Sequence, residues 1–285
     1  MSKRKDKNNI FSSDSGEAAD VIPKRDVMKD DFNWQVPVET VPVPSQGKVY
    51  SQEHPLHLKE TIEVKAMTAK EEDILSSRAL IQEGTAVTHL IKSCLINRDV
   101  DPEDMLIGDR NALMIAIRIT GYGSRYRVVA KCPSCGNSSD QDFDLSDLTI
   151  KRLLIEPVTS GLNEFSFNLP ITKKTVHFKF INGKDEKDIS VAAERRKKLM
   201  PGAKIDNNIT SRLASQIVSI DGVTDRSKIN MFINNMPAQD SRRLRKYIVE
   251  NEPGINMKTQ MDCPHCGTVS EVALPLGAGF FWPED

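Results

Sequence analysis

The sequence predicts an α+β protein in which a mainly helical insertion, with a β-hairpin of its own, separates the two halves of a small ribbon. Two observations carry this prediction. The pattern Cys-Pro-x-Cys-Gly occurs at residues 132–136 and again at 263–267, and strand-like runs flank each copy. The 127 residues between Cys135 and Cys263 are enough for a domain, and most of them favour helix. An N-terminal mixed α/β region precedes the first copy.

The composition indicates a soluble globular chain of one large or two ordinary domains. Its 285 residues are 39% hydrophobic and 28% charged, with a formal net charge of −1. A charge so close to zero gives no overall attraction to nucleic acid or to an anionic membrane. No apolar run approaches the roughly 18 residues that span a bilayer, so we expect no membrane partner.

The N-terminal region begins with two unlike segments. Residues 1–33 lack apolar periodicity and are rich in Lys, Asp, Asn and Ser, which predicts a disordered or partner-ordered arm. Residues 34–44 are rich in Val and Pro, and proline excludes helices and central strands. This extended arm could lie across a neighbouring subunit or serve as an ordinary linker. Residues 45–48 predict a turn, after which Val49 and Tyr50 resume an extended path.

One strand and one helix come next. Residues 61–65 alternate apolar and polar side chains, as a half-buried strand does. Thr68 and Glu71 form a capping-box pattern, which predicts a helix from that point to about Ile81. Gly84 is expected to end this helix, because glycine readily adopts the left-handed conformation of a helix C-terminus.

Three further helical segments are predicted before the first cysteine motif. Residues 87–95 suit a short buried helix, with Cys94 as a small buried hydrophobe. Asp101, followed by proline, predicts another short helical turn. Asp109 is expected to cap a strongly apolar helix, which the glycines within residues 121–123 end.

The ribbon halves and the insertion complete the predicted fold. Strands at 125–130 and 141–145 flank the first cysteine motif, and residues 255–261 and 269–274 flank the second. The insertion is predicted to contain a hairpin at 164–167 and 175–180, followed by helices at 185–199, 208–219, 225–235 and 238–250. The expected divisions are an arm at 1–33, an extended arm plus mixed domain at 34–124, ribbon halves at 125–147 and 255–275, the insertion at 148–254, and a C-terminal tail at 276–285.

The paired cysteine motifs predict a structural metal site. Each motif places two thiolates on a tight turn, with a glycine free to adopt the left-handed conformation that the turn needs. Two such turns facing each other supply four sulfurs in a tetrahedron, which suits zinc and leaves no open position for catalysis. Redox dithiols or disulfides are the alternatives, although a redox pair usually occurs once, at a helix start. The predicted zinc ligands are Cys132, Cys135, Cys263 and Cys266.

A metal held by these ligands would close a long loop, so we expect it to fix the orientation of the insertion relative to the first domain. No second site of chemistry emerges. The histidines are scattered, and His265 inside a cysteine motif is expected to face solvent. Without a glycine-rich phosphate loop or a nucleophile paired with histidine, we expect no catalytic residues, no enzyme activity and no small-molecule substrate. Basic clusters at 195–198 and 242–246 suit solvated helix faces, although either could contact nucleic acid or an acidic protein.

A set of ordered motifs carries a family resemblance between about residue 40 and residue 275. The set comprises Pro44-Ser45-x-Gly47-Lys48-x-Tyr50, residues 67–75, Ile107-Gly108-Asp109-Arg110-Asn111, residues 121–123 and the two cysteine motifs. With these motifs the chain resembles the T4-type bacteriophage baseplate protein family. The resemblance implies a structural or assembly component of the baseplate of contractile-tailed phages, in or near its hub and wedge region, without catalytic residues.

The resemblance also implies the partners and the location. Other phage baseplate proteins would be bound through the arm and the domain surfaces, in multiple copies around the tail axis of the virion. Folding and assembly are expected in the host cytoplasm, where cysteines stay reduced. The alternative from another class is a zinc-ribbon nucleic-acid-binding factor. The basic clusters favour it, whereas the near-zero net charge and the lack of a row of stacking aromatics make nucleic acid an unlikely partner.

Overall fold

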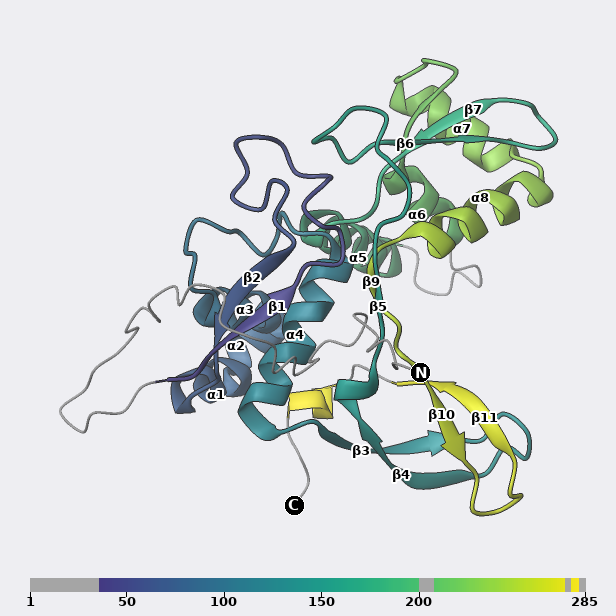
Figure 1. Cartoon of the computed structure of the whole chain (residues 1–285). Coiled ribbons are helices and arrows are strands. Elements are labelled where there is room, and N and C mark those ends of the chain that lie inside the picture. The colour runs from purple at the N-terminus through teal and green to yellow at the C-terminus, as the bar shows by residue number, and fades with distance from the viewer. Residues whose placement is uncertain (1–35, 200–207, 275–277, 282–285) are drawn as a thin grey trace, which may run out of the picture.

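The computed structural model describes residues 36–199, 208–274 and 278–281 (Figure 1). The predicted arm at 1–33 lies outside the described residues. The predicted C-terminal tail is described only over η2 (Ala278–Phe281), a short 3₁₀ helix. Its Phe280 is 1% exposed and meets the ring of Tyr126 edge-on at a centroid distance of 5.3 Å. This part of the tail therefore belongs to the core.

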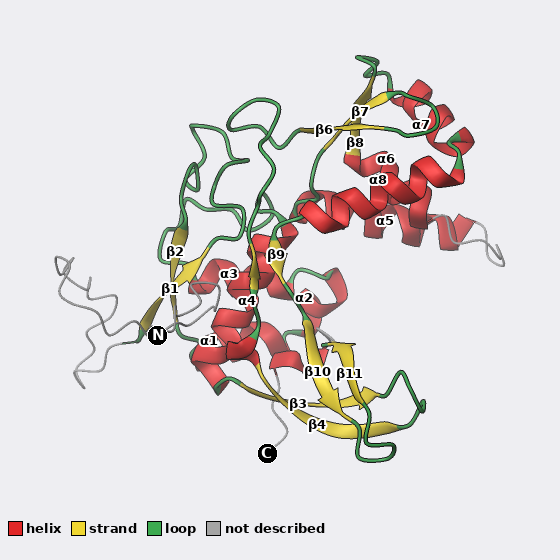
Figure 2. Cartoon of the chain, turned by 45° about the vertical axis from the view of Figure 1, so that its right-hand side comes forward, coloured by secondary structure: helices red, strands yellow, loops and turns green. Residues whose placement is uncertain are grey.

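The N-terminal part of the fold, which we call the base, contains four helices and a small two-stranded sheet (Figure 2). The two strands pair antiparallel, with Val41 opposite Ile62, and the longest helix lies against both of them. The elements of the base are β1 (Val38–Pro42), β2 (Thr61–Lys65), α1 (Ala69–Ser76), α2 (Arg78–Glu83), α3 (Ala86–Cys94) and α4 (Ile107–Tyr122).

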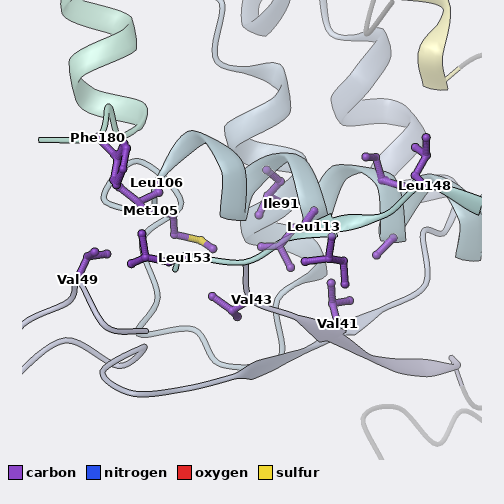
Figure 3. Close-up of a cluster of buried hydrophobic side chains, with 14 of the residues drawn as sticks. Val41, Val43, Val49, Ile91, Met105, Leu106, Leu113, Leu148, Leu153 and Phe180 are labelled. Atoms are coloured by element: carbon purple, nitrogen blue, oxygen red, sulfur yellow. The ribbon is translucent and has the colours of Figure 1, made fainter. Parts of the chain in front are cut away.

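The Val-Pro stretch is part of this base, so the prediction of an arm across a neighbour or a linker is wrong for its described residues. Val41 and Val43 are at most 2% exposed. They lie in one buried cluster with Ile91 of α3 and Leu113 of α4 (Figure 3). Burying such side chains is worth about 1.5–3 kcal/mol each. An apolar helix surface within the same chain therefore holds this stretch in place.

Several local predictions for the base need correction. The capping box at Thr68 forms, but the helix breaks at Ser77, where an extended backbone separates α1 from α2. Asp101 starts a hydrogen-bonded turn rather than a helix, with its side chain accepting from the N–H of Glu103 at 3.0 Å. Residues 49–50 lie in turns rather than in an extended path. The strand at 61–65, the buried helix near 87–95 and the stop at Gly123 are confirmed.

Two hairpins form the end of the molecule opposite the insertion, and we call them the hairpin end (Figure 1). They consist of β3 (Arg125–Lys131) with β4 (Ser138–Asp144), and β10 (Lys258–Asp262) with β11 (Val269–Ala273). The predicted strand pairs are confirmed. Each hairpin is its own two-stranded sheet, however, and no strand of the first pairs with a strand of the second within the described residues. The helix η1 (Leu145–Asp147) follows the first hairpin.

The insertion contains a three-stranded sheet and four helices. Its elements are β6 (Phe165–Asn168), β7 (Thr175–Phe178), α5 (Gly183–Leu199), α6 (Asn208–Gln216), β8 (Ile217–Ile220), α7 (Arg226–Asn235) and α8 (Ala238–Asn251). The hairpin of β6 and β7 is confirmed. The predicted helix at 208–219 is wrong at its end, because the β-branched run from Ile217 pairs with β7 as a third strand. Asp221 and Gly222, both with positive φ, then turn the chain.

The two connections between the hairpin end and the insertion run side by side (Figure 1). They are β5 (Ile150–Lys151) and β9 (Gly254–Ile255), which pair antiparallel, and we call them the neck. The neck was not predicted, because two residues per strand leave no periodicity to detect. Its strand β9 packs against α4 and so brings the end of the insertion onto the base.

Candidate metal centre and the joint of the insertion

The four predicted ligands meet between the two hairpins. Their sulfur atoms all lie within 4.8 Å of one another. The Sγ atoms of Cys132 and Cys266 are 3.8 Å apart, and those of Cys135 and Cys263 are 3.7 Å apart. A tetrahedron with zinc–sulfur bonds of about 2.3 Å has edges of about 3.8 Å. The sulfurs are too far apart for a disulfide, whose bond is about 2.05 Å. The donor set and its spacing therefore fit a metal ion with four thiolate ligands.

The two turns that carry these cysteines have the same local geometry. In the first, the N–H of Gly136 donates to the carbonyl of Cys132 at 2.9 Å, and Gly136 has a φ of +76°. In the second, Gly267 donates to Cys263 at 2.9 Å with a φ of +67°. Neither conformation suits a residue with a side chain. Each motif thus closes the same turn and presents its two sulfurs to the other hairpin.

The environment of the thiols differs from site to site. Hydrogen bonds from the side chain and backbone of Thr268 lower the pKa of Cys266 to about 6. The pKa of Cys132 is also lowered, first by a backbone hydrogen bond from Cys135. A backbone hydrogen bond from Asn137 acts to lower the pKa of Cys135, but burial and the neighbouring thiols outweigh it and raise that pKa to about 11. Without a cation the four groups cannot all ionise together, whereas a divalent metal favours all four thiolates.

A second site of close contact lies at the start of α4, where three segments meet the residues Gly108, Asp109 and Arg110. We call this site the joint. A Cβ atom on Gly108 would lie 1.8 Å from the carbonyl oxygen of Pro253 and 2.8 Å from the Cα of Gly254. Both of these are backbone atoms, which cannot move away as a flexible side chain could. Only glycine lets the neck pack this closely on the helix.

Asp109 connects the joint to the turn at 44–50, and the prediction that it caps the helix is wrong. The residue at the N-terminal boundary of α4 is Leu106, and Asp109 sits in the first turn, 1% exposed. Its carboxylate accepts from the Ser45 N–H at 2.9 Å, the Ser45 hydroxyl at 2.6 Å and the Tyr50 hydroxyl at 2.6 Å. The Tyr50 oxygen in turn accepts from the Leu106 N–H at 3.0 Å. Two motifs 64 residues apart in sequence therefore form one buried network.

The electrostatics of this network follow from its burial. Burial raises the pKa of Asp109, while the hydrogen bonds from Ser45 and Tyr50 act to lower it. Burial and the neighbouring carboxylate together raise the pKa of Tyr50 well above its usual value. No buried side-chain nitrogen or oxygen among the described residues lacks a hydrogen-bond partner. The buried polar groups of this network are therefore fully hydrogen-bonded.

Arg110 contacts the first residue of α5. Its guanidinium donates to the Thr88 hydroxyl at 3.1 Å, and a Cβ on Gly183 would lie 2.3 Å from its Nη1. Burial lowers the pKa of Arg110, and the charges of Glu186 and Glu103 oppose that shift. Backbone hydrogen bonds reinforce the contact, from Ile107 N–H to Ile181 at 3.1 Å and from Gly183 N–H to Met105 at 3.1 Å. The joint thus holds the start of α5, within the insertion, directly.

These contacts change one expectation. The cysteine cluster was expected to orient the insertion, but it lies at the far end of the neck (Figure 1). In the described structure the insertion meets the base at the joint instead. The sequence does not predict the joint, although residues 107–111 form one of the motifs that carry the family resemblance.

The remaining candidates behave as solvent-exposed or core residues. Cys94 is fully buried, and burial raises the pKa of its thiol to about 12. His265 is exposed. In the second basic cluster Arg242 and Arg243 are exposed on α8, and in the first Arg196 is half-buried beside Ser211. None of the described helices combines the length and the apolar character needed to cross a bilayer.

Comparison with known proteins identifies one family. The model of a family described as T4 bacteriophage base plate protein matches residues 38–282, which is most of the chain. The match includes the base, the insertion and both cysteine motifs. No curated protein and no solved structure matches the chain.

Proposed function

We propose that this chain, which belongs to the T4 bacteriophage base plate protein family, is a structural and assembly component of the baseplate of a contractile-tailed bacteriophage. Its family makes it a component of the virion tail. The family match over residues 38–282 is the observation that carries the proposal, because it spans every described part of the fold except the first two residues. The buried network at Asp109 supports a structural role, because its hydrogen bonds connect segments far apart in the sequence.

The metal in this proposal is a structural zinc ion bound by Cys132, Cys135, Cys263 and Cys266. The sulfur spacing of 3.7–3.8 Å supports tetrahedral four-thiolate coordination. Bound zinc would offset two of the four thiolate charges and hold the two hairpins together. It would offer no open position for a substrate.

The chain is proposed to act by binding its neighbours. It would contact other baseplate proteins through the N-terminal arm at 1–33 and through its domain surfaces, in multiple copies around the tail axis. The division into a mixed domain to residue 124, the ribbon halves and an insertion at 148–254 is part of this proposal. Folding and assembly would take place in the host cytoplasm.

Locating the protein in the particle tests the proposal. Mass spectrometry of purified virions should detect the chain at a constant ratio to the other tail proteins. Cryo-electron microscopy of the tail should then show density for the base and the insertion within the baseplate, in contact with neighbouring proteins. Absence from both virions and assembly intermediates of the tail would contradict the proposal.

A second candidate, a zinc-ribbon nucleic-acid-binding factor, is favoured by one observation. Residues 148–254 contain 19 Lys and Arg against 12 Asp and Glu, a formal net charge of +7, whereas the rest of the chain contains 20 against 28, a net charge of −8. If the basic insertion bound nucleic acid, the affinity would fall steeply with added salt. Electrophoretic mobility shifts with DNA and RNA at low salt test this; an unshifted band for both excludes the candidate.

A further inference from the structure

An open groove lies on one side of the hairpin end, between β3 and β11. It has a volume of about 380 Å³. Four consecutive residues of β3, Val128–Lys131, line it with the last three residues of β11 and the following Leu274, together with Pro133 and Phe143. Side chains of successive strand residues point to opposite faces. A groove lined by consecutive residues therefore runs along the strand edges rather than across one face of a sheet.

The register of the hairpins leaves main-chain groups unpaired at this groove. Leu145 N–H donates to the carbonyl of Ser124 at 2.9 Å and Cys132 N–H to that of Asn137 at 2.8 Å. In the alternating pattern of an antiparallel pair, the even-numbered residues of β3 thus direct their N–H and C=O groups toward β4. The odd-numbered residues, Val129 among them, direct theirs away from β4.

The same reasoning applies to the second hairpin. Leu274 N–H donates to Met257 at 2.8 Å, so the main-chain groups of Glu271 and Ala273 point away from β10. Both hairpins are two-stranded sheets. Within the described part of the chain, the edges of β3 and β11 at the groove therefore have no strand partner.

The side chains at the groove are mainly apolar or cationic, apart from Glu271 of β11, which forms an ion pair with Lys258 at 2.9 Å. One face supplies apolar lining, from Val128, Phe143, Val272 and Leu274. The other face of β3 presents Arg127, the 63% exposed Val129 and Lys131. Arg127 reaches Asp140 of β4 at 3.6 Å, whereas Lys131 makes no ion pair with any described residue. An added strand would meet apolar side chains on one face and cations on the other.

We propose that this groove binds an extended segment of a partner protein, which adds a strand to the free edge of β3 and carries apolar and acidic residues in alternation. The main-chain groups require a strand, because a helix has no free N–H and C=O groups along its length to offer. The apolar residues would enter the groove, and the acidic ones would lie beside Arg127 and Lys131. The proposal rests on the proposed role in assembly.

Strand β4 of the first hairpin already pairs with the other edge of β3 and carries acidic residues at every second position from Asp140 to Asp144. Along β4 the residues Asp140, Asp142 and Asp144 alternate with Gln141 and Phe143, and Asp142 pairs with Arg125 at 2.7 Å. A second copy of the chain is a poorer occupant, since pairing two β3 edges would bring Arg127 and Lys131 of both copies together.

A peptide with the sequence of residues 137–145, Asn-Ser-Ser-Asp-Gln-Asp-Phe-Asp-Leu, is therefore a suitable probe. Labelled with a fluorophore, it is titrated with the full-length, zinc-loaded protein, and its polarisation is measured. The matched control peptide has Lys at the three Asp positions. We expect saturable binding of the first peptide and about tenfold weaker binding of the control, because its lysines would meet Arg127 and Lys131 in place of the aspartates. No binding of the first peptide, or equal binding of both, would overturn the proposal.

Two protein variants locate the binding. Lys131→Glu should weaken binding about threefold to tenfold, whereas Lys92→Glu, the same charge change on an exposed residue of α3, should leave it unchanged. Val129→Pro removes an edge N–H without touching the pairing with β4 and should abolish binding. The zinc content of each variant shows whether its hairpin end is folded. If Val129→Pro loses zinc, its loss of binding is not interpreted, and the comparison of Lys131→Glu with Lys92→Glu tests the proposal. Equal effects of the two lysine variants would place the peptide elsewhere. Such a result would overturn the groove proposal but not the proposed baseplate role, which is tested separately by detecting the chain in virions.

Discussion

The joint and the hairpin end hold distant segments together by opposite means. At the joint the contacts are between backbones and fully buried polar groups, with Gly108 against Pro253 and Asp109 bound by Ser45 and Tyr50. The hairpin end spans roughly 40 residues, about the size at which a fold usually needs a metal or a disulfide. Its outward strand faces are charged and exposed. We therefore expect close packing to suffice at the joint and a metal bound by the four sulfurs to be needed at the hairpin end.

The contacts at the joint set the orientation of the insertion. The joint touches the neck, α5 and the turn at 44–50 at once, so it fixes the insertion on the base. The cysteine cluster connects only the two hairpins. A change at the joint should therefore alter the whole molecule, and a change at the cysteines should stay local.

Cys132→Ser should have the largest effect on metal binding. Removing one of four thiolates from a site whose apparent binding energy is about 10 kcal/mol or more should abolish stable zinc binding at neutral pH. Elemental analysis of the purified protein measures this. Cys94→Ser, which alters a buried cysteine outside the cluster, is the matched control and should keep one zinc per chain. Full zinc content in Cys132→Ser would show that the cluster is not the site.

Gly108→Ala should have the largest effect on the unfolding free energy. Its new methyl group would overlap backbone atoms of Pro253 and Gly254, and we expect a loss of about 3 kcal/mol or more, measured by urea denaturation. Gly222→Ala is the control, because a Cβ there meets nothing within 4 Å and only the positive φ opposes it, at about 1 kcal/mol. Equal losses in the two variants would refute the packing argument.

Glu71 should make the base sensitive to acid. Burial opposes its charge, but hydrogen bonds from Lys65, Ser93 and Thr68 outweigh burial and lower its pKa to about 2. Because the folded pKa lies below the unfolded value of about 4.5, the ionised form stabilises the fold above that value. This stabilisation, about 2–3 kcal/mol, is lost as the pH falls from 4.5 toward 2.

The measurement is urea denaturation of the wild type and of Glu71→Gln at several pH values. The variant should be less stable at pH 7, and the difference should shrink below pH 4.5. A difference that stays constant down to pH 3 would mean that the Glu71 charge makes no contribution.

Asp109→Asn should have the smallest effect of the four. The oxygen of the asparagine amide can still accept from the Ser45 N–H. Its NH₂ group is a donor, however, and it would face the Ser45 and Tyr50 hydroxyls, which donate to the native carboxylate. We expect a loss of about 1–2 kcal/mol with zinc content unchanged. A loss of zinc in this variant would show that the joint and the cysteine cluster are coupled.

The sequence was sufficient for features with local signals. The cysteine turns, the strands beside them and α4 follow from spacing, alternation and glycine stops. The joint could not be predicted, because Gly108 meets Pro253 across 145 positions of the sequence and nothing local marks that contact. Asp109 gave a misleading signal, since a helix start favours acidic residues whether they cap it or bind a distant turn. β8 was missed for a similar reason, because its strand pairing with β7 is non-local.

Hydrogen–deuterium exchange of the full-length protein, with and without a zinc chelator, separates the role of the cysteine cluster from that of the joint. The account predicts that removal of zinc increases exchange in peptides from 125–144 and 258–273. Peptides from 44–50, from α4 and from the start of α5 should keep their protection, because the joint needs no metal. Increased exchange at the joint and across the insertion would contradict the account, since it would mean that the cysteine cluster holds the whole molecule together.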